Sequence, residues 1–203
     1  MHVALIGATG RVGSRLVTEL LSRGHTVTGV ALHPPSNDTR ASLTCVAADA
    51  TDPAALAPVL QGHDAVLSAT RFVSSDAHAL ITAVKAAGVR RLLVVGGAGS
   101  LEVAPGKALV ATEGFPEAFK AEAEAGAQFL QVLKKESDLD WTFLSPSANF
   151  APGARTGKFR LGHDQLLTDT AGKSQISMED FAIAMVDEPE HPAHGRQRFT
   201  VGY

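Results

Sequence analysis

A glycine triplet near the N-terminus constrains the fold of this chain more than any other sequence feature. The apolar run His2–Ile6 leads into Gly7, Gly10 and Gly13, and apolar side chains then recur at helical spacing up to Gly24. A glycine triplet alone would also fit an ordinary strand–helix turn, but here it lies between an N-terminal strand and a helix. The stretch therefore predicts a strand, a tight glycine turn and a helix that together form a dinucleotide site.

Each glycine has a separate role in such a turn. Gly7 lets the chain leave the strand in a conformation that a Cβ would hinder, and Gly10 lets a pyrophosphate approach the backbone. Gly13 lets the helix pack closely on the strand, so that phosphates lie against N–H groups at the positive end of the helix dipole. We assign this binding role to Gly7, Thr9, Gly10, Arg11, Val12 and Gly13.

The rest of the chain alternates between strand and helix patterns without an internal repeat. Further strands are expected over residues 26–32, 42–48, 64–68, 91–95, 140–144 and 198–201, and helices over 52–60, 76–87, 116–136 and from 177 onward. Residues 101–115 are expected to form a loop. The pattern predicts an α/β fold: a single doubly wound domain over residues 1–203 with a mainly parallel sheet. Its small C-terminal substrate region would include a lid at about residues 145–175.

Several motifs carry a family resemblance. They are Gly7-Ala-Thr-Gly10-Arg-Val-Gly13, Asp49 after the third strand, VVGGAGS at 94–100 and WTFLSPSANFAPGARTG at 141–157. Together they resemble the atypical branch of the short-chain dehydrogenase/reductase superfamily, which includes NmrA-like proteins and biliverdin/flavin reductase-like enzymes. The resemblance covers nearly the whole chain and implies a Rossmann-like fold that binds NAD(P)H.

Further cofactor contacts are expected where the strands end, because open parallel sheets bind ligands beyond their carboxyl ends. Ser68, Ala69 and Thr70 are expected near the ribose that links the two halves of the cofactor. The resemblance implies that Asp49, next to Ala50, hydrogen-bonds the adenine amino group. The remaining expected contacts are Gly96 and Gly97 near the nicotinamide and Pro146 on the same side.

The end of the second strand bears on the choice between NAD and NADP. It reads Leu32-His33-Pro-Pro, without the acid that would bind a ribose 2′-OH and without the arginine that relatives often carry at Leu32. The missing acid mildly favours NADP, with NAD as the alternative. Arg11 or Arg40 could contact its 2′-phosphate, and His33 could approach the adenosine or remain a solvated loop residue.

The catalytic pair of the superfamily is a tyrosine four residues before a lysine on the helix at 116–136. Lys120 resembles that lysine and would grip the nicotinamide ribose, or it is an exposed helix lysine. The tyrosine position is Pro116, and the chain's single tyrosine is the distant Tyr203. Ser100 is the nearest candidate to hold a substrate carbonyl, although serine also forms turns. Chemistry that relies on the tyrosine is therefore not expected.

A planar conjugated acceptor such as a flavin or quinone fits this pattern, because hydride can enter an electron-poor ring while water supplies the protons. Two alternatives remain open: an NmrA-like redox sensor that binds the cofactor without turnover, and a reductase of another unsaturated metabolite. Phe150 is a candidate stacking face or a core aromatic. Arg155, with Lys158 and Arg160, could hold an anionic tail of the substrate, or these residues form a solvent-facing strand.

Composition excludes several other classes. The net charge is −3, from 18 basic and 21 acidic residues without a long run of either sign, so no nucleic acid or membrane partner is expected. The single cysteine, Cys45, excludes an intrachain disulfide and fits a reducing cytoplasm. We see no signal peptide or transmembrane segment, and expect a cytoplasmic protein. His191 and His194 lack further ligands for a metal. Whether the chain forms a homodimer stays open.

Overall fold

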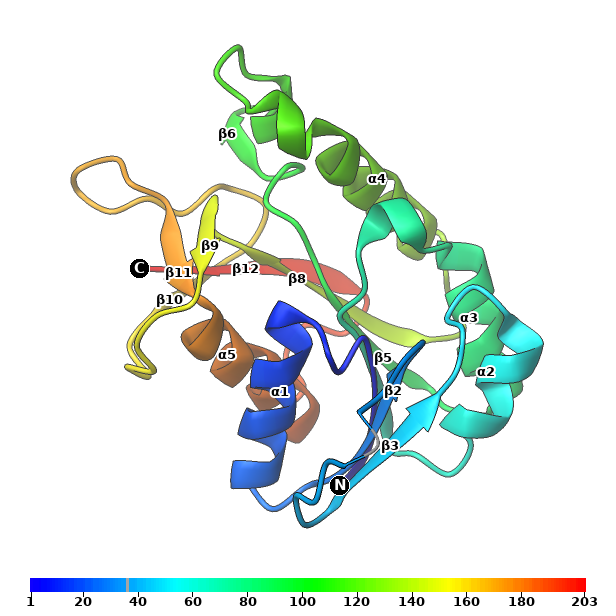
Figure 1. Cartoon of the computed structure of the whole chain (residues 1–203). Helices are drawn as coiled ribbons and strands as arrows, with labels where there is room; N and C mark the ends of the chain where they lie inside the picture. The colour runs from blue at the N-terminus through cyan, green and yellow to red at the C-terminus, as the bar shows by residue number, and fades with distance from the viewer. Residues whose placement is uncertain (36) are drawn as a thin grey trace.

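An eight-stranded sheet organises the molecule in the computed structural model, which describes residues 1–35 and 37–203 (Figure 1). The strand order is β10-β12-β8-β5-β4-β1-β2-β3, and every neighbouring pair is parallel except β10 with β12. The strands are β1 (His2–Ile6), β2 (Thr26–Ala31), β3 (Leu43–Ala47), β4 (Ala65–Ser68), β5 (Arg91–Val95), β8 (Asp140–Pro146), β10 (Arg160–Gly162) and β12 (Gln197–Gly202). The doubly wound α/β prediction is confirmed.

Helices cover both faces of this sheet. On one face α1 (Arg11–Ser22) lies beside α5 (Met178–Glu190); the other face carries α2 (Pro53–Leu60), α3 (Ala77–Ala86) and α4 (Glu117–Leu133) (Figure 1). The strands alternate between two apolar cores. On β4, for example, Val66 packs toward the α2–α4 side and Leu67 toward α1 and α5, both fully buried. Burying a side chain of this size stabilises the fold by about 2 kcal/mol.

Short polar residues fix where the helices begin. Asp52 accepts hydrogen bonds from Ala54 N and Ala55 N at the start of α2, and the Ser177 hydroxyl accepts one from Asp180 N at the start of α5. Both helices thus begin where the sequence pattern predicts them. The Asp180 carboxylate, three residues after Ser177, does not bond back to the start of the helix and instead accepts hydrogen bonds from Thr156, Gly157 N and Tyr203.

Two short pieces of structure depart from the predicted elements. Residues 101–115, predicted as a loop, contain the hairpin β6 (Glu102–Ala104)–β7 (Lys107–Ala108), which turns at Gly106 with φ +72°, and then the 3₁₀ turn η2 (Leu109–Ala111). β9 (Asn149–Ala151) and β11 (Gln175–Ser177) form a separate parallel pair. Strands of two or three residues are too short for an alternating pattern to reveal them. Among the described residues, no helix is long and apolar enough to cross a membrane.

Candidate functional site

The glycine turn has the close contacts that its spacing predicts. Gly7 has φ +80°, and a Cβ there would lie 2.7 Å from the carbonyl oxygen of Ala69. A Cβ on Gly13 would lie only 2.0 Å from the Gly7 carbonyl oxygen. A side chain at either position would therefore push the turn away from the end of β4 or from the helix.

Gly10 is less crowded than these two glycines, since a Cβ there would lie 3.2 Å from the Gly7 carbonyl oxygen. Gly10 is the N-cap of α1 and offers no side-chain cap, and the first turn of the helix carries no acid. The helix thus begins with N–H groups that have no partner within the helix and with the positive end of its dipole unneutralised. Thr9 and Arg11 are exposed beside it and Val12 is half-buried. This helix start is built to bind an anion.

Doubly wound sheets bind nucleotides in a crevice at the point where their strand order reverses, and in this sheet that point lies between β1 and β4, beside the glycine turn. Ser68 and Thr70, at the end of β4, hydrogen-bond each other through their hydroxyls at 3.1 Å, and Ser75 donates to Thr70 at 2.8 Å. Ala69 N donates to Ile6 O, which fixes this loop against β1. These polar groups thus lie at the switch point of the sheet.

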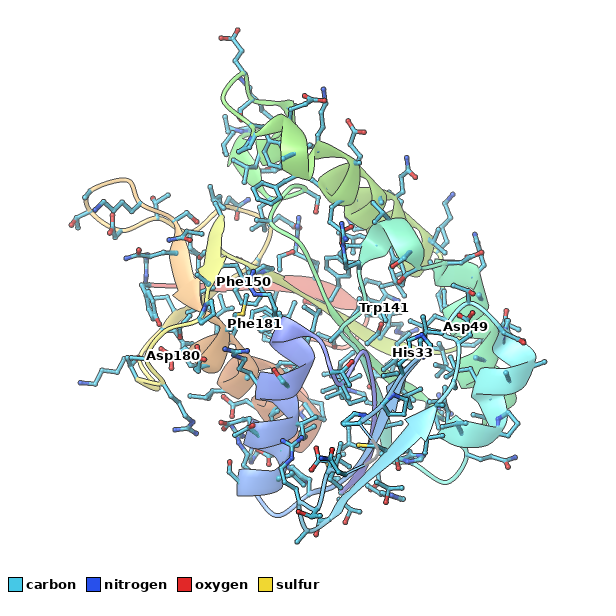
Figure 2. All side chains as sticks on the ribbon, in the orientation of Figure 1. His33, Asp49, Trp141, Phe150, Asp180 and Phe181 are labelled. Carbon is cyan, nitrogen blue, oxygen red and sulfur yellow. The ribbon has the colours of Figure 1, made fainter. Side chains whose placement is uncertain are left out.

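The adenine side of the crevice is formed by the ends of β2 and β3. His33 and Asp49 lie at this end of the sheet (Figure 2), and Leu32 is 61% exposed. The Asp49 carboxylate accepts hydrogen bonds from Thr51 N at 2.8 Å and Thr51 Oγ1 at 2.7 Å. The backbone bond, followed by the hydroxyl bond, lowers the pKa of Asp49 and so keeps it an acceptor, as an adenine amino group requires.

A cavity, called here the acceptor cleft, lies beyond the ends of β5 and β8. Its volume is about 660 Å³, a size typical of small-molecule sites. It is lined by Phe72, Gly96, Gly97, Ala98, Gly99, Leu109, Thr112, Gly114, Phe115, Pro116, Phe119, Glu122, Ala123, Ala148, Asn149, Leu166, Gly172 and Ser174. The predicted nicotinamide residues Gly96 and Gly97 thus lie in its wall.

One wall of the acceptor cleft is fixed by a long-range contact. Glu122 on α4 accepts hydrogen bonds from Phe72 N at 2.7 Å and Val73 N at 3.1 Å, in the 3₁₀ turn η1 (Phe72–Ser74) that follows β4. Gly126 allows the same approach, since a Cβ there would lie 2.8 Å from the Phe72 ring. Sequence reasoning missed Glu122, whose partners lie about fifty residues earlier in the chain.

The known proteins that this chain resembles agree with this geometry. A family described as NAD(P)H-binding matches residues 7–192, which include the glycine turn and the acceptor cleft. The chain belongs to this NAD(P)H-binding family. Together with the structures below, this match supports its place among the atypical short-chain dehydrogenases/reductases.

Three solved structures are similar to this NAD(P)H-binding protein over its whole length. One, from Bacteroides thetaiotaomicron and provisionally named an epimerase, is 44% identical with a TM-score of 0.95 over 100% of this chain and 96% of the other. Another, from Burkholderia pseudomallei and provisionally named an exported protein, is 48% identical with a TM-score of 0.91 over 100% of both chains. A third, from Streptococcus pneumoniae and provisionally named an NADH-flavin reductase, is 33% identical with a TM-score of 0.86 over 100% and 99%.

The structure does not bring the predicted catalytic residues into the lining of the acceptor cleft. The Ser100 hydroxyl accepts a hydrogen bond from Arg198 at 3.3 Å, and Arg198 is in turn paired with Asp164. Lys120 lies on the solvent side of α4, with its Nζ 3.8 Å from the Glu117 carboxylate. Pro146 is buried within β8. The cleft is lined instead by residues one turn apart on α4, among them Phe119.

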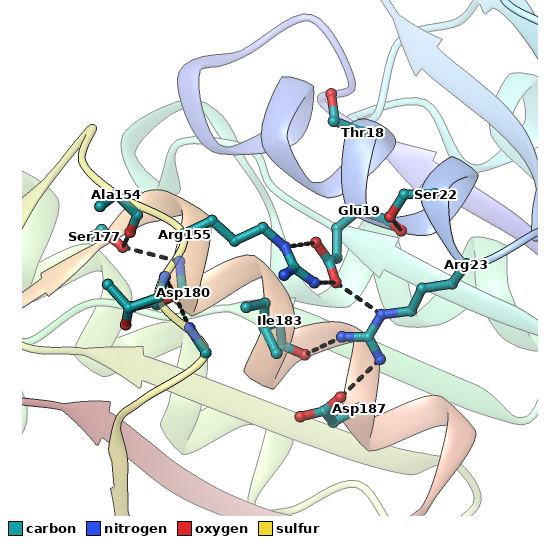
Figure 3. A network of polar contacts seen from close by, with 12 residues as sticks. Thr18, Glu19, Ser22, Arg23, Ala154, Arg155, Ser177, Asp180, Ile183 and Asp187 are labelled. Carbon is teal, nitrogen blue, oxygen red and sulfur yellow. Dashed lines mark hydrogen bonds and ion pairs between the residues drawn. The ribbon is translucent and has the colours of Figure 1, made fainter.

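The two predicted substrate residues also lie elsewhere. Phe150 packs on Phe181, with ring centroids 4.8 Å apart, at the edge of the core between the sheet and α5 (Figure 2). Arg155 donates two hydrogen bonds of 2.8 Å to the buried Glu19 on α1 (Figure 3). The bond from Arg155, helped by Arg23 and opposed by burial, lowers the pKa of Glu19.

The lid prediction is correspondingly wrong for one part of the segment. Gly153 N donates to Glu179 and Gly157 N to Asp180, so that this part lies along α1 and α5. Burial opposes ionisation of Asp180, but hydrogen bonds from Thr156, Gly157 and Tyr203 outweigh it and lower its pKa. Carboxylates on α1 and α5 thus bind this part of the segment. The residues of the expected lid that line the acceptor cleft are Ala148, Asn149, Leu166, Gly172 and Ser174.

Proposed function

We propose that this protein is an NAD(P)H-dependent oxidoreductase that passes hydride to a planar conjugated acceptor such as a flavin or quinone. The observation that carries the proposal is the acceptor cleft. It lies beside the dinucleotide crevice, Phe115 and Phe119 line it, and the chain's one tyrosine is bound to Asp180 elsewhere. Membership of the NAD(P)H-binding family and the likeness to the Streptococcus pneumoniae protein support the same class of reaction.

Residues at the glycine turn and the strand ends would bind the cofactor, and residues of the acceptor cleft would bind the acceptor. The start of α1 would bind the pyrophosphate, the end of β4 the ribose, and Gly96 and Gly97 would admit the nicotinamide close to the backbone. Bound NAD(P)H supplies the hydride. Phe119, 64% exposed on the cleft, offers an unhindered face on which a flat ring can stack. Positioning of this kind is the main contribution that hydride transfer to a conjugated ring needs from a protein.

We infer that NADP is the preferred cofactor, with NAD as the alternative. The end of β2 offers Leu32 and His33 and no carboxylate for a ribose 2′-OH. Of the two predicted phosphate partners, Arg40 is paired with Asp38 at 2.6 Å. The side chain of Arg11, within the described residues, makes no hydrogen bond or ion pair and is exposed beside the glycine turn. Arg11 is therefore the better candidate to contact a 2′-phosphate.

The test follows oxidation of NADPH and NADH by absorbance with free flavins, quinones and simple carbonyl compounds as acceptors. We expect turnover with flavins or quinones and none with the carbonyl compounds. Replacing Phe119 with alanine should raise KM for the acceptor about fivefold, the worth of one aromatic stacking contact. Leu161→Ala is the matched control, since Leu161 is 51% exposed and lies outside the cleft lining.

Two results would refute this proposal. If calorimetry shows that both nucleotides bind but no acceptor oxidises either, the protein is a sensor of the cofactor rather than a reductase. If the carbonyl compounds turn over as fast as the flavins, the missing tyrosine does not restrict the chemistry.

A further inference from the structure

We propose that the acceptor cleft selects an uncharged planar acceptor, namely a quinone or a flavin without a phosphate tail. This inference rests on the proposed function and specifies its substrate class. The observation behind it is the charge of the cleft wall: of the described residues that line the cleft, only Glu122 carries a charge, and it is an acid. A site for a phosphorylated ligand ordinarily carries arginine or lysine, and the helix N-terminus at the cleft, that of α4 at Pro116, has the acid Glu117 in its first turn, which opposes an anion there.

Two cations that adjoin lining residues in the chain lie close to carboxylates. Arg71 lies 3.8 Å from Glu122 and is 77% exposed, and Lys120 lies 3.8 Å from Glu117. The other exposed charged residues that adjoin the lining in the chain are the basic Lys173 and the acidic Glu113 and Glu124. Together with Glu122 these groups leave the cleft without an excess of positive charge, so a phosphate would find repulsion or weak, solvated pairs there.

The arginines of the C-terminal region do not supply the missing charge. Arg155 is bound to Glu19, and Arg160 donates to the carbonyl oxygens of Thr168 and Tyr203. Arg198 is paired with Asp164 and is only 8% exposed. Each would have to break an existing contact before it could hold a phosphate.

The remaining lining suits a flat ring with a neutral polar tail. Phe115 and Phe119 provide aromatic surface, and Thr112, Asn149 and Ser174 provide hydroxyl and amide groups. The ribityl chain of riboflavin carries only hydroxyls, which such groups can hydrogen-bond. FMN has the same ring and chain but adds a phosphate that carries nearly two negative charges. Comparing these two flavins isolates the phosphate.

Flavin fluorescence gives the affinity directly, without turnover. We would titrate the full chain, alone and with NADP⁺, into riboflavin and into FMN at low ionic strength. We expect riboflavin to bind about fivefold more tightly than FMN, as one unit charge opposing a phosphate at several ångströms in a largely solvated site would give. An uncharged naphthoquinone should displace riboflavin, while its sulfonate should do so more weakly.

A gain of charge provides the second variant. Gly114 lines the cleft, is exposed, has no atom within 4 Å of a built Cβ, and has a backbone conformation open to any residue. Gly114→Arg should therefore fold normally and strengthen FMN binding relative to riboflavin by about threefold, as exposed ion pairs do. Gly114→Gln, similar in length but neutral, should leave the ratio of the two affinities unchanged.

The outcomes separate the two proposals. Equal or tighter binding of FMN by the unaltered protein overturns the charge inference, and so does a ratio that shifts equally in the arginine and glutamine variants. Absence of binding by riboflavin, FMN and the naphthoquinone also overturns it. A clear preference for riboflavin without any oxidation of NAD(P)H supports the charge inference and instead refutes the proposed oxidoreductase function.

Discussion

Two glycine substitutions with similar costs in stability should differ in their effect on cofactor binding. Gly10 and Gly24 both lie at ends of α1, but only Gly10 is at the end that the phosphates would approach. Gly10 has an ordinary φ of −70°, and a Cβ there would lie 3.2 Å from Gly7 O. Gly24 has φ +78° and nothing within 4 Å of a built Cβ.

The size of each effect follows from these environments. Alanine at Gly24 must adopt the left-handed conformation, at a cost of about 1 kcal/mol. Alanine at the N-cap position of Gly10 caps the helix less well and costs up to about 1 kcal/mol. Its methyl group would also hold a pyrophosphate away from the first N–H groups of α1. Losing one hydrogen bond to a charged group costs about 2 kcal/mol, or roughly thirtyfold in affinity.

The assay combines thermal denaturation with calorimetric titration of NADPH and NADH. We expect both Gly10→Ala and Gly24→Ala to lower the melting temperature by about 2–4 °C, as about 1 kcal/mol does in a domain of this length. Only Gly10→Ala should weaken nucleotide binding. If the two variants bind the nucleotides equally well, the glycine turn is not the phosphate site and the reasoning from its geometry fails.

Three further predictions concern residues that the structure places away from the acceptor cleft. Tyr203→Phe removes the hydroxyl that donates to Asp180 at 2.8 Å; denaturation should show a loss of about 1 kcal/mol while kcat with flavin is unchanged, and a lower kcat would place this hydroxyl in the chemistry. Arg155→Gln breaks the ion pair with Glu19; it should lower stability and leave the acceptor KM unchanged, so a raised KM would restore Arg155 as a substrate residue. Folding lowers the pKa values of Glu19 and Asp180. Both carboxylates therefore stabilise the fold fully when the pH is above the ordinary pKa of a carboxyl group, and this stabilisation is lost as the pH falls through their lowered pKa values. Melting temperatures measured from about pH 5 to about pH 3 should fall, less steeply in Asp180→Asn, and a flat profile would contradict the assignment.

The sequence was sufficient for the sheet and the glycine turn because both depend on local chemistry. A buried parallel strand such as β5 is a continuous apolar run, and the tight approach of Gly13 to Gly7 can be read from spacing alone. The walls of the acceptor cleft depend on contacts between distant parts of the chain. The sequence around Glu122 gives no sign that its carboxylate accepts a hydrogen bond from Phe72 N. The sequence around Arg155 likewise gives no sign that its partner is Glu19. A charged residue in a loop fits a ligand and a distant partner equally well.

The same contacts determine which reaction the cleft can support. Reducing an isolated carbonyl leaves an alkoxide that needs an acid at once, and none of the described residues that line the cleft is a suitable acid. Tyr203 donates to Asp180 and Ser100 accepts from Arg198, both outside the lining, while Glu122 already accepts two backbone hydrogen bonds. Thr112 donates its hydroxyl proton to Leu109 O, and aliphatic hydroxyls of this kind are too weakly acidic for the task. A flavin or quinone spreads the incoming charge over its ring, so its product anion can persist until water protonates it. Because position 116 is a proline and not a tyrosine, the proposed function restricts the acceptor to molecules that need no acid from the protein. Flavins and quinones are such molecules, and they also fit the aromatic, uncharged part of the cleft wall.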